Sequence, residues 1–150
     1  MKTFEQFNFK PFVNDTIRLL NFKKPTKIQE RVIPQVMHHT DIIGISQTGT
    51  GKTHAFLLPI MNEIHTDSDK VQAVITAPTR ELATQIFEHA RLFQKANPAI
   101  RVSLVIGGND KQKAIDKLAV QPHVVIGTPG RIRDLSINEQ ALKITTADIF

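Results

Sequence analysis

Short apolar runs alternate with segments of helical periodicity from residue 41 onward, and this alternation limits the chain to one fold class. The runs are rich in Val and Ile, as expected of strands buried on both faces of a sheet. They cover residues 41–46, 72–77, 101–106 and 123–127. The segments between them carry apolar residues three or four positions apart, which predicts helices with one apolar face. These residues are Phe56, Ile60, Ile64, Leu82, Ile86, Ala90 and Phe93. The pattern predicts an α/β fold in which helices flank a parallel sheet with right-handed crossovers.

Helices are expected before the first strand, and the end of the chain is expected to begin a further strand. Apolar residues within 12–20 predict one helix that Pro25 closes, and residues 26–37 predict a second helix that Pro34 bends. Residues 147–150 are expected to open a fifth strand. Because a domain does not naturally end there, we expect the sheet to be incomplete in this chain.

Size and composition suit one globular domain. A chain of 150 residues can bury a single core, and 41% hydrophobic with 22% charged residues excludes a disordered or collagen-like chain. The net charge of +5 and the pI near 9.7 favour a polyanionic partner such as nucleic acid, although excess Lys and Arg also keep ordinary surfaces solvated. Charge alone therefore leaves the partner open.

The residue types that are absent narrow the environment of the protein. Cysteine does not occur, which excludes disulfides and thiolate metal sites and suits a reducing compartment. The six histidines show no metal-ligand spacing, the amino terminus lacks the apolar core of a signal peptide, and no apolar run approaches membrane-spanning length. We therefore expect a cytoplasmic protein.

A glycine-rich segment, Gly-Thr-Gly-Lys-Thr at residues 49–53, follows the first predicted strand and opens a predicted helix. This is the context of a phosphate-binding loop. Glycines let backbone N–H groups face the phosphates, Lys52 supplies a point charge, and the helix start adds its positive dipole end. The Thr53 hydroxyl is expected to hold Mg²⁺. Ser46 stands where the strict pattern has glycine or alanine, and a small residue fits there. The other interpretation is a glycine turn that caps a helix.

Further motifs follow in a fixed order. They are Phe4 with Asn-Phe-Lys-Lys-Pro-Thr-Lys-Ile-Gln at 21–29, the phosphate loop at 46–53, Pro-Thr-Arg-Glu-Leu-Ala at 78–83, Gly-Gly at 107–108 and Thr-Pro-Gly-Arg at 128–131. In these motifs the chain resembles the DEAD-box family of ATP-dependent RNA helicases, over essentially its whole length.

The resemblance implies a three-layer, RecA-like P-loop NTPase fold. It implies that residues 1–40 form a helical Q-motif region packed on the core. Residues 41–150 would then form the N-terminal RecA-like ATP-binding domain without its C-terminal strands. ATP and Mg²⁺ are the implied cofactors, and the implied partners are RNA and the second RecA-like domain of the full-length protein.

The resemblance assigns the nucleotide to the Q motif and the phosphate loop. In the family, the amide at Gln29 pairs with the adenine edge and the aromatic at Phe22 stacks on the base. An amide offers a donor beside an acceptor, which matches adenine. Taken alone, Thr26-x-x-Gln29 is a capping box, and the two roles can coexist. Asn21 lies where the family commonly has glycine. The implied ATP-binding residues are Phe4, Phe22, Gln29, Ser46, Gln47, Thr48, Gly49, Thr50, Gly51, Lys52 and Thr53.

The later motifs are assigned by the resemblance to RNA. Two of them follow predicted strands and begin helices, at the sheet edge where parallel sheets bind ligands. Taken alone, Thr79 and Thr128 are simple helix caps, Pro129 suits a first helical turn, and the glycine pair is a turn. The family binds RNA through phosphates and 2′-hydroxyls, which implies no sequence preference. The implied residues are Pro78, Thr79, Arg80, Glu81, Gly107, Gly108, Thr128, Pro129, Gly130 and Arg131.

Catalytic residues are not expected in this chain. ATP hydrolysis needs an aspartate after a strand to hold the metal, and in the family this lies in Asp-Glu-Ala-Asp, which does not occur here. Asp148 precedes its predicted strand, so it is expected at the wrong edge of the sheet. We therefore expect a fragment of an ATP-dependent RNA helicase, without useful ATPase activity alone. A DNA helicase, another P-loop NTPase and a non-enzymatic nucleic-acid-binding or partner-docking module remain alternatives.

Overall fold

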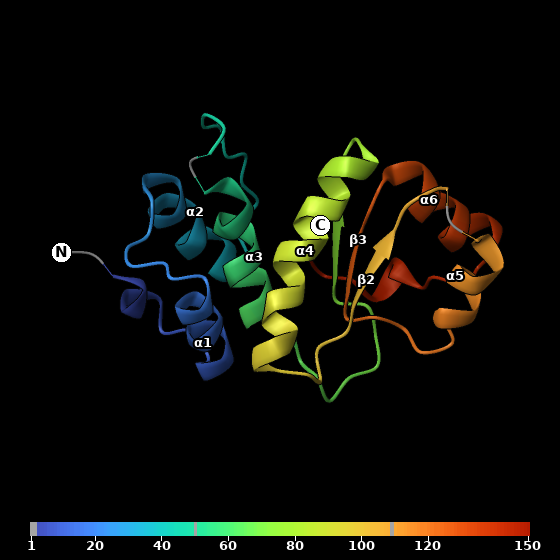
Figure 1. The fold of residues 1–150 in the computed structure, drawn as a ribbon, viewed down its shortest axis with the longest axis horizontal. Helices are drawn as coiled ribbons and strands as arrows, with labels where there is room; N and C mark the ends of the chain where they lie inside the picture. The colour runs from blue at the N-terminus through green and yellow to red at the C-terminus, as the bar shows by residue number, and fades with distance from the viewer. Residues whose placement is uncertain (1–2, 50, 109) are drawn as a thin grey trace. The chain divides into compact units, whose positions relative to one another are not determined.

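The computed structural model describes residues 3–49, 51–108 and 110–150. The chain divides into two compact units (Figure 1). The first contains Met1–Ile64 with Lys95–Asn97, and the second contains His65–Gln94 with Pro98–Phe150. The predicted domain boundary after residue 40 stays a prediction, and each unit is described by itself below.

The described elements of the first unit are all helical. A 3-10 helix at Phe4–Phe7 precedes α1 (Pro11–Leu19), α2 (Lys27–Met37) and α3 (Lys52–Asn62). The two helices predicted before residue 40 are thus confirmed, and Pro34 lies inside α2. Helix α2 packs along α3, and the Asn62 side chain accepts a hydrogen bond of 2.7 Å from the backbone N–H of Lys10. Helix α3 is buried over most of its length, so its amino terminus is firmly placed.

The strand predicted at residues 41–46 is wrong. These residues have no regular secondary structure, and their isoleucines are exposed, with Ile43 at 90% and Ile45 at 88% of their maximal accessible surface. A strand needs a neighbour for its N–H and C=O groups, and the described part of the first unit contains no other strand. The apolar sequence alone therefore did not suffice to make a strand.

The second unit contains a parallel sheet with strand order β1–β3–β2. Strands β1 (Ala73–Thr76), β2 (Val102–Val105) and β3 (Val124–Gly127) confirm the three later apolar runs. Ile149 makes a parallel bridge to Ala73, so the predicted opening of a further strand is also confirmed, on the outer side of β1. Gly127 is required at the end of β3, because a Cβ there would lie 2.0 Å from the Val105 carbonyl oxygen.

Helices cover both faces of this sheet (Figure 1). Helix α4 (Arg80–Ala96) lies on one face and buries Ala83, Ile86, Ala90 and Phe93. Helices α5 (Lys111–Lys117) and α6 (Pro129–Arg133), a π-helical turn at Asp134–Asn138 and a 3-10 turn at Ile144–Thr146 follow on the other side. Helix α5 was not predicted. The result is the expected three-layer α/β arrangement.

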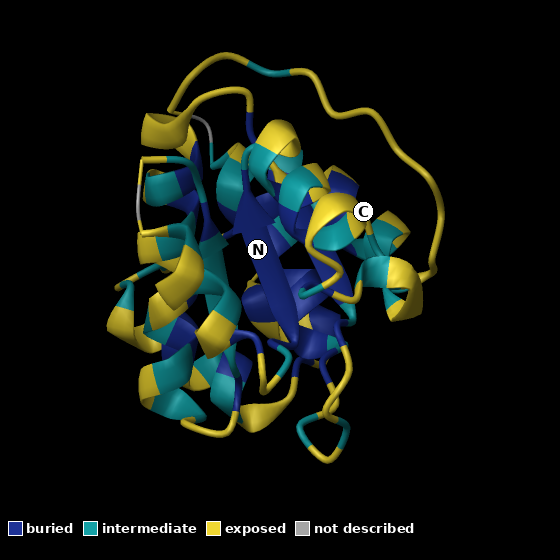
Figure 2. Cartoon of the chain, turned by 90° about the vertical axis from the view of Figure 1, so that its right-hand side faces the viewer, coloured by how far each residue is buried: buried dark blue, intermediate teal, exposed yellow. Residues whose placement is uncertain are grey.

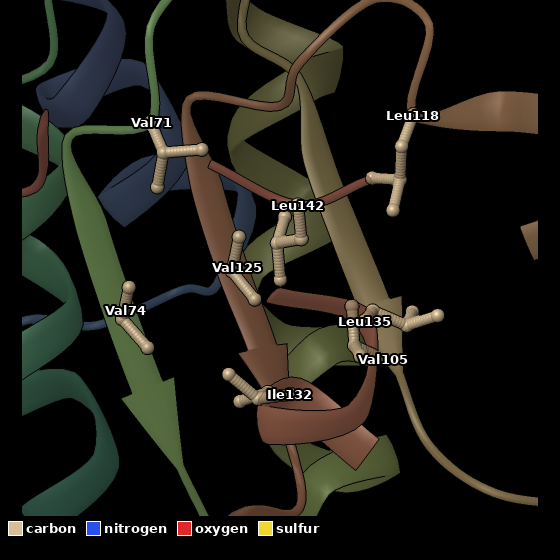
Figure 3. Packing of buried hydrophobic residues seen from close by; sticks show 8 residues of the cluster. All are labelled: Val71, Val74, Val105, Leu118, Val125, Ile132, Leu135 and Leu142. Atoms are coloured by element: carbon tan, nitrogen blue, oxygen red, sulfur yellow. The ribbon is translucent and has the colours of Figure 1, made fainter. Parts of the chain in front are cut away.

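The core of the second unit explains why its loops are held in place. On the α5 and α6 side, valines of all three strands pack against leucines of the later segments (Figure 3). Strands β1 and β3 are buried over most or all of their length, and buried strand appears dark blue in Figure 2, whereas β2 is mostly half-buried. The members of this cluster are Val71, Val74, Val105, Leu118, Val125, Ile132, Leu135 and Leu142.

None of the described helices is long and apolar enough to cross a membrane.

Candidate functional sites

The phosphate-loop segment of the first unit has the backbone that its sequence predicts. Gly49 and Gly51 have φ angles of 80° and 87°, a left-handed conformation that side chains strongly disfavour. Gly51 is the N-cap of α3, so the free N–H groups of the first helical turn are at the loop. Lys52 begins the helix, and its Nζ donates a 2.7 Å hydrogen bond to the Ser46 carbonyl. The lysine ammonium has three N–H donors, so donors remain that a phosphate could accept from.

The remaining loop residues lie around these anchors. Gln47, Thr48 and Gly49 are exposed, Ser46 is half-buried, and Thr53 is half-buried in the first turn of α3. Thr50 lies outside the described residues. The loop follows an irregular segment and not the predicted strand. The strand before the loop is thus the one part of its predicted surroundings that is wrong.

Gln29 joins the phosphate loop to α2. The capping box is present: Gln29 N–H donates to the Thr26 hydroxyl at 3.3 Å, and the Gln29 side-chain oxygen accepts from Thr26 N–H at 3.0 Å. The amide nitrogen of Gln29, which is only 2% exposed, donates to the Gly51 carbonyl at 3.2 Å. A Cβ at Gly51 would lie 2.5 Å from this nitrogen, so only glycine allows the approach. Both the cap and a link to the loop use the same side chain.

Aromatic rings connect the 3-10 helix at Phe4–Phe7 to α3. Phe4 is buried, and its ring stacks on the half-buried Phe22 with centroids 6.3 Å apart and an interplanar angle of 20°. His54 meets Phe22 edge-on, at 5.0 Å and 89°. The predicted adenine-site aromatics are therefore together. His54 is a residue that the sequence reasoning missed, because its contact with Phe22 joins residues far apart in the chain and leaves no local pattern.

Asn21 lies in a backbone conformation that glycine also adopts. Its φ is 58°, in the left-handed region where asparagine is the best-tolerated residue after glycine. Asparagine is therefore compatible with the conformation immediately before Phe22.

The three later motifs of the second unit meet at the carboxyl edge of the sheet. Residues 78–81 follow β1, residues 107–108 follow β2, and residues 128–131 follow β3. Hydrogen bonds extend the ladder into this edge, from Ala77 N–H to the Gly127 carbonyl at 3.0 Å and from Thr128 N–H to the Val105 carbonyl at 3.1 Å. The sheet thus brings together segments that are far apart in the sequence.

Arg80 and Gly108 are in direct contact at this edge. Gly108 has a φ of 85°, and a Cβ there would lie 2.8 Å from one Arg80 guanidinium nitrogen. The Thr79 hydroxyl accepts from Leu82 N–H at 3.1 Å and so caps α4 as predicted. Pro78, Glu81 and Arg80 are exposed, and Gly107 is half-buried. The guanidinium therefore lies against Gly108, and Arg80 remains exposed.

The segment after β3 differs from the one after β1. Thr128 occupies the N-cap of α6, but its side chain makes no capping hydrogen bond, so the predicted cap is only positional. Pro129 lies in the first helical turn as expected, and Pro129 and Gly130 are exposed. Arg131 is 15% exposed in its side chain and lies 3.6 Å from the Asp134 carboxylate. In this conformation the Arg131 guanidinium faces a carboxylate and not an open site where a phosphate could bind.

Asp134 is the centre of a small charge network. Hydrogen bonds from Lys111 and then Asn138 hold the pKa of Asp134 below its usual value. Hydrogen bonds to Glu139 and then Asp134 raise the pKa of Lys111 above its usual value. The Lys111 amine lies 2.7 Å from Glu139 and 2.9 Å from Asp134. Both groups are therefore charged near neutral pH, and Asp134 can act as a standing counter-ion for Arg131.

Asp148 lies at the opposite edge of the sheet from these motifs. Its N–H donates to the Gln72 carbonyl at 3.1 Å, immediately before β1 begins, and the strand bridge follows it at Ile149. The prediction that Asp148 is not at the ligand-binding edge is confirmed. Among the described residues, no group of three or more His, Asp or Glu side chains could hold a metal ion.

Comparison with known proteins decides among the P-loop alternatives. The family model for DEAD/DEAH box helicases matches residues 26–148. The chain belongs to this family. A DEAD-box ATP-dependent RNA helicase, CshB, of Listeria monocytogenes is 56% identical over 145 residues, which cover 96% of this chain and 33% of that protein. CshB of Bacillus subtilis is 54% identical over 147 residues, 97% of this chain and 33% of that protein. The chain spans about a third of the length of these curated relatives.

Solved DEAD-box structures have the same fold. A DEAD box protein from Methanococcus jannaschii matches with a TM-score of 0.87 and 32% identity, over 98% of this chain and 40% of that one. Saccharomyces cerevisiae Dbp5 bound to RNA and ADP BeF3 matches with a TM-score of 0.85 and 30% identity, over 98% of this chain and 37% of that one. The RecA-like parallel sheet is thus shown, with only part of its strands in this chain.

Proposed function

We propose that this chain is the ATP-binding part of an ATP-dependent RNA helicase, with the adenine at Gln29 and Phe22 and the phosphates at residues 46–53. The observation that carries the proposal is the 3.2 Å hydrogen bond from the Gln29 amide to the Gly51 carbonyl. It supports the proposal because the residue proposed to read adenine lies against the loop proposed to hold phosphate. The stacked Phe4 and Phe22 rings support a flat apolar seat for the base.

The Thr53 hydroxyl is proposed to hold Mg²⁺ together with phosphate oxygens of the nucleotide. The fit is that of a substrate-bound magnesium, because Mg²⁺ keeps several waters and needs few protein ligands. The described residues offer one hydroxyl in the first turn of α3 and no cluster of carboxylates. When bound, the ion neutralises phosphate charge, and this chain contributes the hydroxyl, Lys52 and the helix N–H groups that orient the phosphates.

The carboxyl edge of the second unit is proposed to contact the RNA backbone. Arg80 is exposed beside Gly108, and the starts of α4 and α6 offer free N–H groups, which suits phosphate and sugar contacts. No aromatic side chain occurs in residues 78–81, 107–108 or 128–131, which favours backbone contact over base stacking. Arg131 would join this surface if it exchanged Asp134 for a phosphate.

Hydrolysis and strand separation are proposed for the longer protein. The curated relatives are about three times the length of this chain and are named ATP-dependent RNA helicases. We propose that a second RecA-like domain closes on ATP and RNA in this protein, and that the site of action is the cytoplasm. The lack of cysteine suits that compartment.

Base choice tests the nucleotide assignment. The 150-residue chain is expected to bind ATP more tightly than GTP, because good paired hydrogen bonds to a base edge discriminate by about 1–3 kcal/mol. Gln29→Ala should remove this preference. Calorimetric titration of both nucleotides measures the ratio of the two dissociation constants.

A matched control separates base reading from helix stability. Gln35 lies on the same helix and is exposed, so Gln35→Ala should keep the preference. Gln29→Ala also removes a capping box, and for that reason the ATP to GTP ratio is the readout rather than affinity alone. Equal binding of both nucleotides by the unaltered chain would refute the assignment.

The RNA assignment is tested by salt dependence. Arg80→Ala should weaken binding of a single-stranded RNA uniformly across sequences and lower the slope of log affinity against log salt by about one. Arg133→Ala, which removes an exposed charge from α6, is the matched control and should change the slope less. Equal slopes for both variants would remove Arg80 from the RNA surface.

A further inference from the structure

An open hollow of about 520 Å³ lies in the second unit, and Arg131 is the only motif residue among those that line it. Its floor is β2 with the residue that follows it, residues 102–106. Phe87 of α4 lines one side, and Ala114 and Leu118 line the other. The lining therefore comes from both layers of helices as well as from the sheet.

The hollow follows the outer edge of β2. Ser103 and Val105 lie opposite Val125 and Gly127 in the sheet, on the face covered by α5, while Val102 and Leu104 lie on the alternate face, toward α4. Because residues from both faces line one hollow, the opening lies at the edge of the strand between the two helical layers. Val102, Ser103 and Leu104 are only half-buried, unlike the fully buried β3.

This edge carries backbone groups that point away from the sheet. The Arg101 carbonyl accepts from Val124 N–H at 3.2 Å and the Val105 carbonyl from Thr128 N–H at 3.1 Å, so these residues face β3. By alternation, the N–H and C=O groups of Val102 and Leu104 face outward. Across residues 3–49, 51–108 and 110–150, no strand lies beside this side of β2. Such an edge is a template for one more strand.

The charge of the hollow selects the kind of strand. Lys113 and Lys117 lie one helical turn apart on α5, both are exposed, and both line the hollow. Arg131 also lines it, but its charge is paired with Asp134. Asp110 is the only carboxylate among the lining residues. An extended segment that carried acidic side chains would therefore find complementary charge above an apolar floor.

We propose that the outer edge of β2 binds an extended acidic peptide segment of a partner protein, which adds to the sheet as a further strand. The outward N–H and C=O groups supply the main-chain hydrogen bonds, Phe87 and Leu104 accept apolar side chains, and Lys113 with Lys117 accept the carboxylates. RNA fits less well, because the floor is apolar and offers a strand edge instead of an array of phosphate ligands.

The probe for this site is the peptide Glu-Val-Glu-Leu-Glu-Val-Glu, labelled for fluorescence anisotropy with the full 150-residue chain. The same peptide N-methylated at alternate residues is the backbone control, since it loses the donors that a strand needs. The unmodified peptide is expected to bind at least tenfold more tightly than the N-methylated peptide. Equal affinity of the two peptides, or no binding at millimolar concentration, would overturn the proposal.

Charge reversal locates the site on the chain. Lys113→Glu with Lys117→Glu should weaken peptide binding at least tenfold, whereas Lys70→Glu with Lys143→Glu, the same change at exposed lysines elsewhere in the unit, should weaken it less than threefold. Circular dichroism checks that both variants fold. A single-stranded uridine oligomer forms the other arm. If reversal at Lys113 and Lys117 abolished RNA binding and left the peptide unaffected, the hollow would belong to RNA and the proposal would be wrong.

Discussion

The two units treat similar apolar sequences in opposite ways. Residues 123–127 form a strand in which Val124, Val125 and Ile126 are completely buried, whereas Ile43 and Ile45 in the segment 41–46 are about nine-tenths exposed at 90% and 88%. Both segments are short and rich in Val or Ile. The difference lies in their neighbours, because β3 has a strand on each side and the segment 41–46 has none in its own unit. An apolar run predicts which residues can be buried, and pairing with neighbouring strands determines whether they are buried.

The same contrast applies to the ligand loops. The loops after β1, β2 and β3 are held by a hydrogen-bonded sheet edge. The phosphate loop leads directly into helix α3, and its Gly51 carbonyl accepts a hydrogen bond from Gln29 of α2. The carboxyl edge of the sheet, which we propose contacts RNA, is therefore preformed by strand pairing, whereas the phosphate loop is linked to neighbouring helices.

The largest expected effect compares two isoleucines. Ile126→Ala removes a fully buried side chain from the central strand and should lower the free energy of unfolding by about 2–5 kcal/mol. Ile43→Ala is the same change at a 90% exposed position and should alter it by less than about 0.5 kcal/mol. Urea denaturation followed by circular dichroism measures both. A comparable loss at Ile43 would mean that the segment 41–46 is packed in solution.

Lys52→Ala should weaken nucleotide binding by about one hundredfold. A hydrogen bond to a charged group contributes about 1.5–3 kcal/mol, and each 1.4 kcal/mol is about tenfold in affinity. Lys95→Ala, at an exposed lysine, is the matched control. Titration with a fluorescent ATP analogue gives both dissociation constants. Binding of RNA by Lys52→Ala should be unchanged, and parallel loss of ATP and RNA binding would contradict the separation between the two regions.

The sequence predicted most of this arrangement because the relevant signals are local. Glycines at 49 and 51, the Thr26 to Gln29 spacing and the Thr79 cap each depend on a few neighbouring residues, and all three have the expected geometry. The parallel sheet followed from the Val-rich runs with helices between them. Asp148 was correctly placed because strand direction alone fixes which end of a strand it occupies.

The failures concern contacts between distant residues. The strand at 41–46 depends on neighbours that periodicity cannot supply, and helix α5 is short, without a buried residue to produce an apolar face. The pairing of Arg131 with Asp134 and the contact of His54 with Phe22 are choices among several possible partners. Local sequence signals do not rank such partners.

Each unit contains a buried histidine, His54 in the first and His123 in the second. The pH dependence of stability tests the environment of His123. His123 is fully buried, its Nδ1 accepts from Arg101 N–H at 2.9 Å, and its Nε2 lies 2.8 Å from the Ser68 carbonyl. The ring is therefore neutral and protonated on Nε2. Burial, as the largest cause, lowers the pKa of His123 below its ordinary value of 6.5.

Stability should fall as the pH drops below about 6.5. The unfolded chain binds a proton at His123 near its ordinary pKa, whereas the folded chain binds it only at lower pH, so the stabilisation is complete above pH 6.5 and is lost as pH falls toward the folded pKa. One proton gives a slope of at most about 1.4 kcal/mol per pH unit. His123→Gln should make the urea midpoint depend less on pH between pH 7.5 and 5. His65→Gln, the same change at an exposed histidine, should leave this pH dependence unchanged. If the urea midpoint of His123→Gln varied with pH as in the unaltered chain, other groups would be responsible for the pH dependence.

The smallest expected effect concerns the buried histidine of the first unit. His54 holds the Phe22 ring by an edge-on contact of 5.0 Å, and aromatic pairs of this kind contribute about 0.5–1.5 kcal/mol. If Phe22 stacks on the base, His54→Ala should weaken ATP binding about three- to tenfold and leave the binding of inorganic tripolyphosphate unchanged, since only the base uses the ring. His54→Phe keeps an aromatic edge and should restore most of the affinity, and His38→Ala, at an exposed position of the same unit, should have little effect. Equal losses for ATP and tripolyphosphate would mean that His54 acts on phosphate binding at the amino terminus of α3, which begins at Lys52, two residues before His54. The contact of His54 with the Phe22 ring would then not explain the loss.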